Sequence, residues 1–109
     1  MANFAMISQP MGGKTHEEIM DTRNRAIKYL TDHGFTVVDS YFHGGNEPVM
    51  PEAIENRPLF YLAKSIEMMS GCETLYCCEG WDDSRGCIIE HECAADYGLE
   101  IIYEGGEKL

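Results

Sequence analysis

The sequence predicts an α/β domain of three layers, with a four- to five-stranded parallel sheet between helices. Short apolar runs that fit buried strands alternate with longer segments whose apolar residues recur at helical spacing. A strand–helix–strand order requires a right-handed crossover and therefore parallel strands. With 109 residues the chain is long enough for one hydrophobic core, so we expect a single domain over residues 1–109.

The first half of the chain contains two predicted strands and one predicted helix. FAMIS, residues 4–8, is a short apolar run and predicts a central strand. Residues 15–33 carry apolar side chains on one helical face; a capping box begins this helix at Thr15, and Gly34 ends it. FTVVD, residues 35–39, predicts a second strand that lies parallel to the first.

The second half begins with a long irregular segment, residues 41–58, rich in Gly, Pro and Asn. It is either functional or partly ordered by a short helix at residues 51–56. The remaining elements alternate: a helix over residues 59–70, a strand over 74–79, a helix from about Gly86 to Gly98, a strand over 99–104 and a frayed tail over 105–109. This order is typical of a Rossmann/flavodoxin-like sheet.

The composition excludes several classes of partner. Nineteen acidic residues against eight Lys and Arg give a net charge of −11, which disfavours a nucleic-acid polymer but not a single nucleotide. No run approaches a membrane span and no signal segment is evident, so we expect a cytoplasmic protein that does not bind a membrane. The five cysteines form no CxxC pair, so buried thiols are expected, with no metal site and no cofactor.

The segment GWDDSRGCIIEHECA, residues 80–94, runs from a polar, glycine-bounded loop into a helix. Ligands of open parallel sheets bind beyond the carboxyl ends of the strands, so Glu90 lies where a catalytic group is expected. Ile89 and Cys93 form an apolar stripe beside it, and partial burial would raise the pKa of Glu90 or give it a hydrogen-bond partner. The alternative is a solvated surface glutamate.

A second candidate site is the turn SQPMGGKT, which joins the first strand to the first helix. It fails the P-loop pattern, because serine stands where that pattern requires its first glycine. A glycine-containing turn that opens a helix still favours an anion, although an ordinary connecting turn is the alternative. The candidate binding residues are Ser8, Gln9, Pro10, Met11, Gly12 and Gly13.

Aromatic and acidic side chains gather in the loops that follow the strands. The residues concerned are Asp39, Tyr41, Phe42, Trp81, Asp82 and Asp83. Aromatic faces beside carboxylates suit a planar heterocycle attached to a sugar. The alternative is that Phe42 and Trp81 only cover the edge of the core.

With these residues identified, the chain resembles the nucleoside 2-deoxyribosyltransferase-like proteins from Ala5 to about Tyr103. Gly86, Glu90 and Ala94 match the motif G-x-x-x-E-x-x-x-A of that family, whose glutamate is the nucleophile of the transferases. The ISQPM and GWDDSRG segments are similar to those of small bacterial and phage relatives.

The resemblance implies an N-glycosidic enzyme, a hydrolase or deoxyribosyltransferase, that acts on a nucleoside or nucleotide with Glu90 as the nucleophile. Asp83 is expected to protonate the departing base. The transferases carry one aspartate at the position of Ser84 and another at that of Ser65 or Lys64. We expect Ser84 and Gly86 to contact the substrate together with Phe42, Trp81, Asp39, Asp82 and the turn at residues 8–13.

Two further expectations accompany this one. The resembling enzymes complete their sites across subunits, and a domain this small does not easily enclose a nucleoside, so a homo-oligomer is expected. The alternative function is a non-catalytic nucleotide-binding module that senses or sequesters its ligand, in which Glu90 hydrogen-bonds ribose hydroxyls. A structural or interaction domain is a third possibility.

Overall fold

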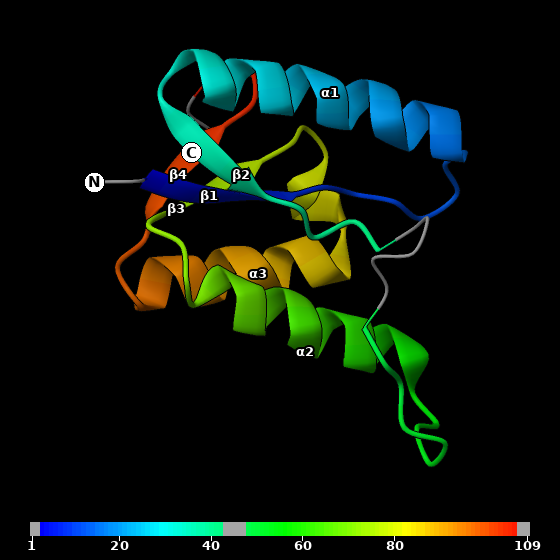
Figure 1. Ribbon diagram of the computed structural model, residues 1–109. Coiled ribbons are helices and arrows are strands. Elements are labelled where there is room, and N and C mark those ends of the chain that lie inside the picture. Colours follow the sequence, from blue (N-terminus) through cyan, green and yellow to red (C-terminus); the bar gives the residue numbers. More distant parts are fainter. Residues whose placement is uncertain (1–2, 43–47, 107–109) are drawn as a thin grey trace.

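Four parallel strands form one sheet at the centre of the protein (Figure 1). They are β1 (Asn3–Ser8), β2 (Phe35–Val38), β3 (Thr74–Cys77) and β4 (Glu100–Tyr103). The computed structural model describes residues 3–42 and 48–106, and in these ranges the strand order is β2-β1-β3-β4. The α/β class and the parallel sheet are therefore confirmed, with four strands and no fifth one among the described residues.

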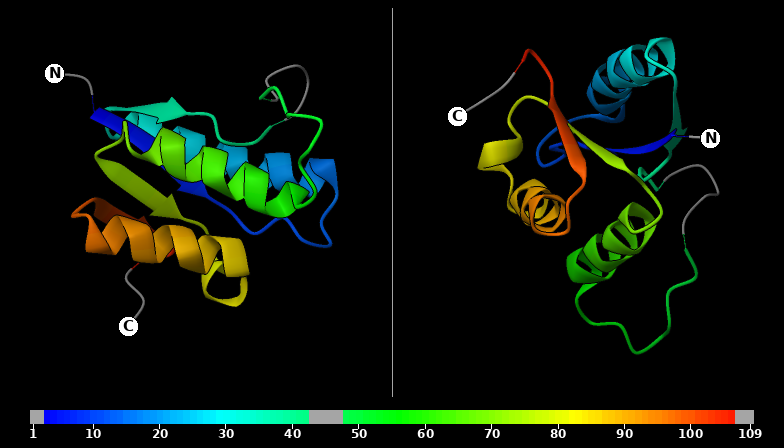
Figure 2. Two further views of the ribbon diagram at one scale, coloured as in Figure 1. Left: turned by 90° about the horizontal axis from the view of Figure 1, so that it is seen from below. Right: turned by 90° about the vertical axis from the view of Figure 1, so that its left-hand side faces the viewer.

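Three helices complete the layers, and they are α1 (His16–Asp32), α2 (Arg57–Met69) and α3 (Arg85–Asp96). Helix α1 covers one face of the sheet, while α2 and α3 lie side by side on the other (Figures 1 and 2). Each face has its own core of buried side chains. Ala26 and Leu30 of α1 pack against Ile7 on one face, and Met69 of α2 and Ala94 of α3 belong to the core on the other.

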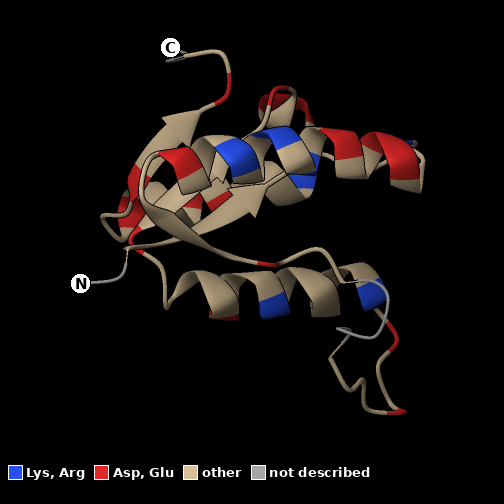
Figure 3. Ribbon diagram, turned by 45° about the horizontal axis from the view of Figure 1, so that its top comes forward, with Lys and Arg blue, Asp and Glu red and all other residues tan. Residues whose placement is uncertain are grey.

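Local sequence accounts for the ends of α1. The predicted capping box is present: the Thr15 hydroxyl accepts from the Glu18 N–H at 3.1 Å, and the Glu18 carboxylate accepts from the Thr15 N–H at 3.0 Å. Gly34 adopts φ +87 directly after the helix, a conformation that L side chains rarely adopt. Figure 3 shows acidic residues at both ends of α1 and basic residues in its middle.

The segment before α2 differs from the prediction. The short helix that was one alternative for residues 51–56 is not formed: the Ile54 N–H donates to the Pro51 carbonyl at 3.2 Å in a single turn. Asn56 is the reason, because its side chain accepts from the Leu59 N–H at 3.1 Å and starts α2 at Arg57. The preceding six residues are too few to form a stable helix. Residues 43–47 of the long segment and 107–109 of the tail lie outside the described ranges.

The edge of the sheet where β1 and β3 end is the point at which the chain diverges. After β1 it crosses to β2 on one side, and after β3 it crosses to β4 on the other. Gly80, with φ +87, turns the chain out of β3 into a 3₁₀ turn over Trp81–Asp83, and α3 follows. Such a divergence opens a crevice for ligands in parallel sheets. No helix in the described part of the chain is long and apolar enough to cross a membrane.

Candidate functional site

Glu90 lies in the row of α3 that faces the interior. Cys87, Glu90 and Ala94 are the buried residues of this helix, and Glu90 is 8% exposed. The expectation that Glu90 lies beside a buried stripe made by Ile89 and Cys93 is wrong, since both of these are only half-buried. The reason is the phase of the helix: α3 packs across the sheet with its i, i+3, i+7 row inward, and Glu90 belongs to that row.

The Glu90 carboxylate is held by hydroxyl groups from two other elements. Ser8, the last residue of β1, donates its Oγ–H to Glu90 Oε1 at 2.6 Å. Ser65 of α2 hydrogen-bonds the same carboxylate. Burial raises the pKa of Glu90 above its ordinary value, while Ser8, Ser65 and the charge of Arg23 act in the opposite direction. The carboxylate is therefore buried yet supported in its ionised form.

A cavity of about 710 Å³ opens above this carboxylate, and we call it the Glu90 cavity. Aromatic rings form one wall, with the Phe42 and Tyr61 ring centroids 5.6 Å apart and Tyr41 beside them. The predicted site residues that line it are Gln9, Met11, Gly12, Phe42, Ser84, Gly86 and Glu90. This volume lies within the range of small-molecule sites, and aromatic rings together with several polar side chains suit a planar ligand.

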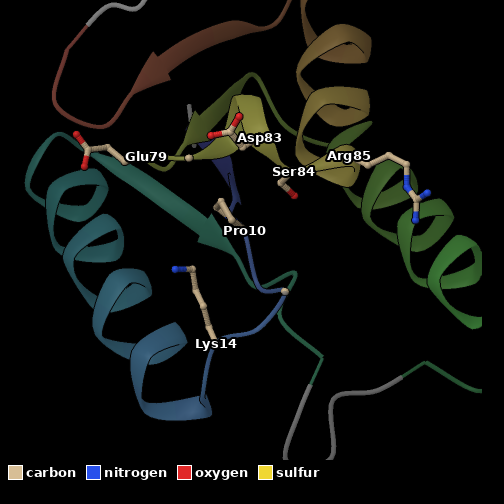
Figure 4. A pocket seen from close by; sticks show the side chains of 8 residues that line it. Pro10, Lys14, Glu79, Asp83, Ser84 and Arg85 are labelled. Atoms are coloured by element: carbon tan, nitrogen blue, oxygen red, sulfur yellow. The ribbon is translucent and has the colours of Figure 1, made fainter.

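A second hollow of about 420 Å³ adjoins the Glu90 cavity, and we call it the Lys14 hollow (Figure 4). Gly12, Ser84 and Arg85 line both spaces. Pro10 and Asp83 line only the Lys14 hollow, so the structure does not bring Asp83 to the cavity of Glu90. In Figure 4, Lys14 extends from the β1–α1 connection and Arg85 from the first turn of α3.

Trp81 lies away from the Glu90 cavity. Its ring stacks on His91 with the centroids 4.1 Å apart and lies 5.8 Å from the ring of Tyr103. His91 Nε2 and the Tyr103 hydroxyl are 2.7 Å apart, so the three rings form one cluster against α3 and β4. Trp81 Nε1 is buried and has no hydrogen-bond partner among the described residues. Trp81 is half-buried and packs against the core on this face of the sheet, which agrees with the alternative that it covers the edge of the core.

The other predicted residues lie around the site without lining the Glu90 cavity. Asp82 is exposed in the 3₁₀ turn, and Gly13 is exposed with φ +76 before α1. Asp39 follows β2, where its Oδ1 accepts from the Tyr41 N–H at 3.0 Å and lies 3.4 Å from Arg23 Nη2. Asp39 therefore contacts Arg23 and does not line the Glu90 cavity.

Sequence reasoning missed Arg23, the largest fully buried side chain among the described residues. Its guanidinium donates to Gln9 Oε1 at 2.9 Å and to Ser40 Oγ at 3.2 Å. The signal was present in the sequence: Arg23 interrupts the apolar row of α1, where an arginine is buried only if it has partners. Ser40 and Tyr61 were also missed, and short polar or single aromatic residues carry no comparable signal.

The cysteines are free thiols, and Cys87 lines the Glu90 cavity. Burial raises the pKa of Cys87, and it raises the pKa of Cys77 and of Cys78 to about 12, so these thiols are neutral at pH 7. Within residues 3–42 and 48–106, no group of three or more His, Cys, Asp or Glu is arranged to hold a metal ion. Among the described residues that line the Glu90 cavity, Glu90 is the only carboxylate.

Comparison with known proteins gives one family. Residues 5–103 match the model of the family described as Domain of unknown function (DUF4406). The matched range extends from β1 to the end of β4 and includes every residue that lines the Glu90 cavity. No curated protein and no solved structure matches the chain.

Proposed function

This chain belongs to the DUF4406 family, and from its site we propose that it binds a nucleoside or nucleotide and cleaves the N-glycosidic bond. Glu90 is the nucleophile, and the sugar goes to water in a hydrolase or to another base in a deoxyribosyltransferase. The observation that carries the proposal is the 2.6 Å hydrogen bond from Ser8 to Glu90 at the floor of the Glu90 cavity. It orients a buried carboxylate where ligands of parallel sheets bind.

The proposed reaction uses the carboxylate of Glu90, which has few hydrogen-bond partners, as the nucleophile. A Glu90 oxygen attacks the anomeric carbon, and the base departs with the electron pair of the bond and takes up a proton. The transition state resembles an oxocarbenium ion, which a nearby carboxylate stabilises. Water, or a second base, then attacks the same carbon and releases the Glu90 carboxylate. Since the ionised form is the nucleophile, activity rises as the pH rises through the pKa of Glu90.

The wall of the Glu90 cavity provides a site for the base. The ring centroids of Phe42 and Tyr61 lie 5.6 Å apart, and the two ring planes make an angle of 33°. One ring or the other can therefore stack on a heterocycle. Leu62 and Pro58 extend this apolar wall along α2. The sugar then lies between the aromatic wall and Glu90.

The Lys14 hollow favours a nucleotide over a nucleoside as the ligand. Lys14 and Arg85 both line this hollow, and in Figure 4 the Arg85 guanidinium extends away from Lys14. Arg85 also lines the Glu90 cavity, so it borders both spaces that a charged group would occupy. Glu79 and Asp83 line the same hollow and offset part of this charge. The preference we propose is accordingly moderate.

One observation favours the second candidate function, a non-catalytic nucleotide-binding module. Glu90 is the only carboxylate that lines its cavity among the described residues, whereas glycosidic enzymes ordinarily use a pair. Without a second acid the base departs less readily. In a binding module Glu90 instead accepts hydrogen bonds from the sugar hydroxyls, and the ligand stabilises the folded protein by mass action.

A chromatographic screen for free base separates the two functions. Wild type, Glu90→Gln and Glu92→Gln are incubated with a panel of ribo- and deoxyribonucleosides and their 5′-monophosphates. An enzyme releases base with wild type and with Glu92→Gln, the matched control on the exposed side of α3, whereas Glu90→Gln lowers release by roughly 10³-fold or more. A nucleotide that co-elutes intact and raises the melting temperature supports the binding module. If no base is released and no nucleotide binds, both functions are contradicted.

A homo-oligomer is part of the proposal. Leu59 in the first turn of α2 and Val49 in the segment before that helix are large apolar side chains left exposed, and Leu59 directly follows Pro58, which lines the Glu90 cavity. A second copy that covers them would also narrow the mouth of the cavity. Sedimentation velocity tests this, and a monomer at micromolar concentration contradicts it.

We also propose that the protein acts in the cytoplasm. The described cysteines are all free, and four of them are buried as thiols, which suits a reducing compartment. Nucleotides are abundant substrates there. Fractionation of the source cells is the direct measurement, and recovery of the protein outside the cytoplasmic fraction contradicts the assignment.

A further inference from the structure

Arg23 is buried on α1 between Ile19 and Ala26, and it is only 1% exposed. Arg25 is the matched comparison on the same helix, because its side chain is 63% exposed and its Nε lies 3.7 Å from a Glu104 carboxylate oxygen. Figure 3 shows that the basic residues of α1 lie in the middle of the helix. Burial is thus a property of position 23 and not of the basic residues of the helix in general.

The burial of Arg23 is costly for stability. Desolvation lowers the pKa of the guanidinium, and the charge of Asp39 only partly opposes this effect. Arg23 Nε is buried without a hydrogen-bond partner among the described residues. An apolar side chain would fill this place in the core without those penalties. Packing therefore does not explain why an arginine stands at this position. The contacts of its other two guanidinium nitrogens suggest a reason.

The Arg23 guanidinium hydrogen-bonds two residues in the wall of the Glu90 cavity. Arg23 Nη1 donates to Gln9 Oε1 at 2.9 Å, and Nη2 donates to Ser40 Oγ at 3.2 Å. Both acceptors line the cavity. Each is also held on its other side, since Gln9 Nε2 donates to the Ile19 carbonyl at 2.7 Å and Ser40 Oγ to the Ile7 carbonyl at 3.1 Å. Arg23 joins the two chains of hydrogen bonds.

We propose that Arg23 is a positioning residue of the Glu90 site. Its planar guanidinium holds Gln9 and Ser40 in the wall of the cavity, and its positive charge acts on the buried carboxylate of Glu90. The inference rests on the proposed function only in that Glu90 is taken as the group that meets the ligand.

Arg23 is the cation whose charge lowers the pKa of Glu90, whereas Arg85, at the start of α3, lines the cavity above this carboxylate. The other elements packed against this carboxylate contribute Ser8 from β1, Ser65 from α2, Cys77 from β3 and Cys87 from α3 itself. The hydroxyls do not ionise near neutral pH. Burial raises the pKa of both thiols, so they too are uncharged there. Loss of the Arg23 charge therefore raises the pKa of Glu90.

The test uses the fact that Gln9 is the only glutamine in the sequence. Selective ¹⁵N labelling of the glutamine side chain gives one amide signal, whose hydrogen exchange reports the bond to Ile19. Carboxyl ¹³C NMR of labelled glutamate follows the titration of Glu90, assigned with Glu90→Gln. Both measurements are made on wild type, Arg23→Lys, Arg23→Met and the control Arg25→Lys.

The two Arg23 variants have different expected results. Arg23→Lys keeps the charge but not the planar fork, so the Gln9 amide loses its protection while the Glu90 midpoint stays close to that of wild type. Arg23→Met loses both, so the midpoint also moves to higher pH. Arg25→Lys changes neither. Where Arg23→Met does not fold, Arg23→Asn replaces it, since it keeps a hydrogen-bonding amide without the charge and leaves Gln9 as the only glutamine.

An unchanged Glu90 midpoint in the uncharged variant overturns the proposal, and so does an unchanged Gln9 amide in Arg23→Lys. A merely structural arginine would lower the melting temperature of its variants without moving the Glu90 midpoint. Neither readout needs turnover. An absence of base release from wild type therefore counts against the proposed function and leaves this test intact.

Discussion

Ser8 Oγ donates to Glu90 Oε1 at 2.6 Å, and this contact joins the carboxyl end of β1 to the first turns of α3. Both side chains are buried, so the bond lies in a region of low dielectric where a charged acceptor gains most from it. It connects two segments that are 82 residues apart in the sequence. The same bond opposes the effect of burial on the pKa of Glu90.

Replacement of this donor should impair the site without a change of shape. In Ser8→Ala the carboxylate loses a hydrogen bond to its charged form, a contact of about 1.5–3 kcal/mol, so the pKa of Glu90 rises further. The acid limb of the pH–rate or pH–affinity profile should move to higher pH. Ser70→Ala is the control, since Ser70 Oγ donates only to the Glu67 carbonyl at the end of α2. An unmoved acid limb in Ser8→Ala contradicts this account.

Glu90 should also make stability depend on pH. Burial raises its folded-state pKa above the unfolded value, so its contribution to stability is fully present below the unfolded pKa and is lost as pH rises through the folded pKa. Glu90→Gln keeps the size of the side chain and removes the titration. Its melting temperature should exceed that of wild type at pH 7 and approach it near pH 4.

Thermal scans across pH measure this difference. For a domain of this size each 1 kcal/mol corresponds to about 4–8 °C in melting temperature. Glu92→Gln, an exposed position on the same helix, should show no such convergence. A difference between Glu90→Gln and wild type that stays constant from pH 4 to pH 8 means that the carboxylate is not desolvated.

The elements of this fold were predictable because their signals are local. The capping box at Thr15 and the glycine at position 34 depend only on neighbouring residues, and both are found in the structure. The parallel sheet follows from the order of strands and helices alone. Position 90 could be identified from where a helix must begin after a buried strand.

The surroundings of Glu90 were not predictable in the same way. Whether this glutamate lies in the buried row or beside it depends on how α3 is rotated on the sheet, which the spacing of residues does not determine. Trp81 and Phe42 have similar sequence contexts, yet only Phe42 lines the cavity, because Trp81 finds His91 to stack on. Whether such a side chain lines the cavity depends on contacts between segments that are distant in the sequence.

This difference between the two aromatic residues can be measured. Phe42→Ala should weaken nucleoside binding by about 1–3 kcal/mol, the range for loss of one base–aromatic stack. Trp81→Phe should leave the affinity within twofold but lower the melting temperature, since it disturbs packing on His91 and Tyr103. Calorimetric titration and thermal scans on both variants provide the comparison. If Trp81→Phe weakens nucleoside binding and Phe42→Ala leaves it unchanged, the base lies near Trp81 instead.

Charge in the Lys14 hollow should determine how the protein treats a 5′-phosphate. Lys14→Ala and Arg85→Ala should each lower affinity for the monophosphate about three- to tenfold, in line with a partly screened charged contact, and leave the nucleoside unaffected. Lys64→Ala is the control, because Lys64 pairs with Glu67 on α2. The selectivity should decrease with added salt. Equal losses for both ligands indicate a general effect on the cavity.

The position of Asp83 leads to the prediction that departs furthest from the family resemblance. A general acid has to lie within hydrogen-bonding distance of the base, directly or through one water, and its loss typically costs roughly 10²–10⁴-fold in rate. Asp83 is exposed and lines the Lys14 hollow rather than the Glu90 cavity. Asp83→Asn should therefore lower base release by less than about tenfold, similar to Asp82→Asn.

The outcome of this comparison also concerns the 3₁₀ turn over Trp81–Asp83. A loss of 10²-fold or more in Asp83→Asn, with Asp82→Asn unchanged, would require the Asp83 carboxylate to reach the base in the bound state. The turn would then have to move toward the Glu90 cavity on binding, although the Trp81 ring anchors it on His91. Because that stack resists such a movement, we expect protonation of the base to come from solvent at the open mouth of the cavity.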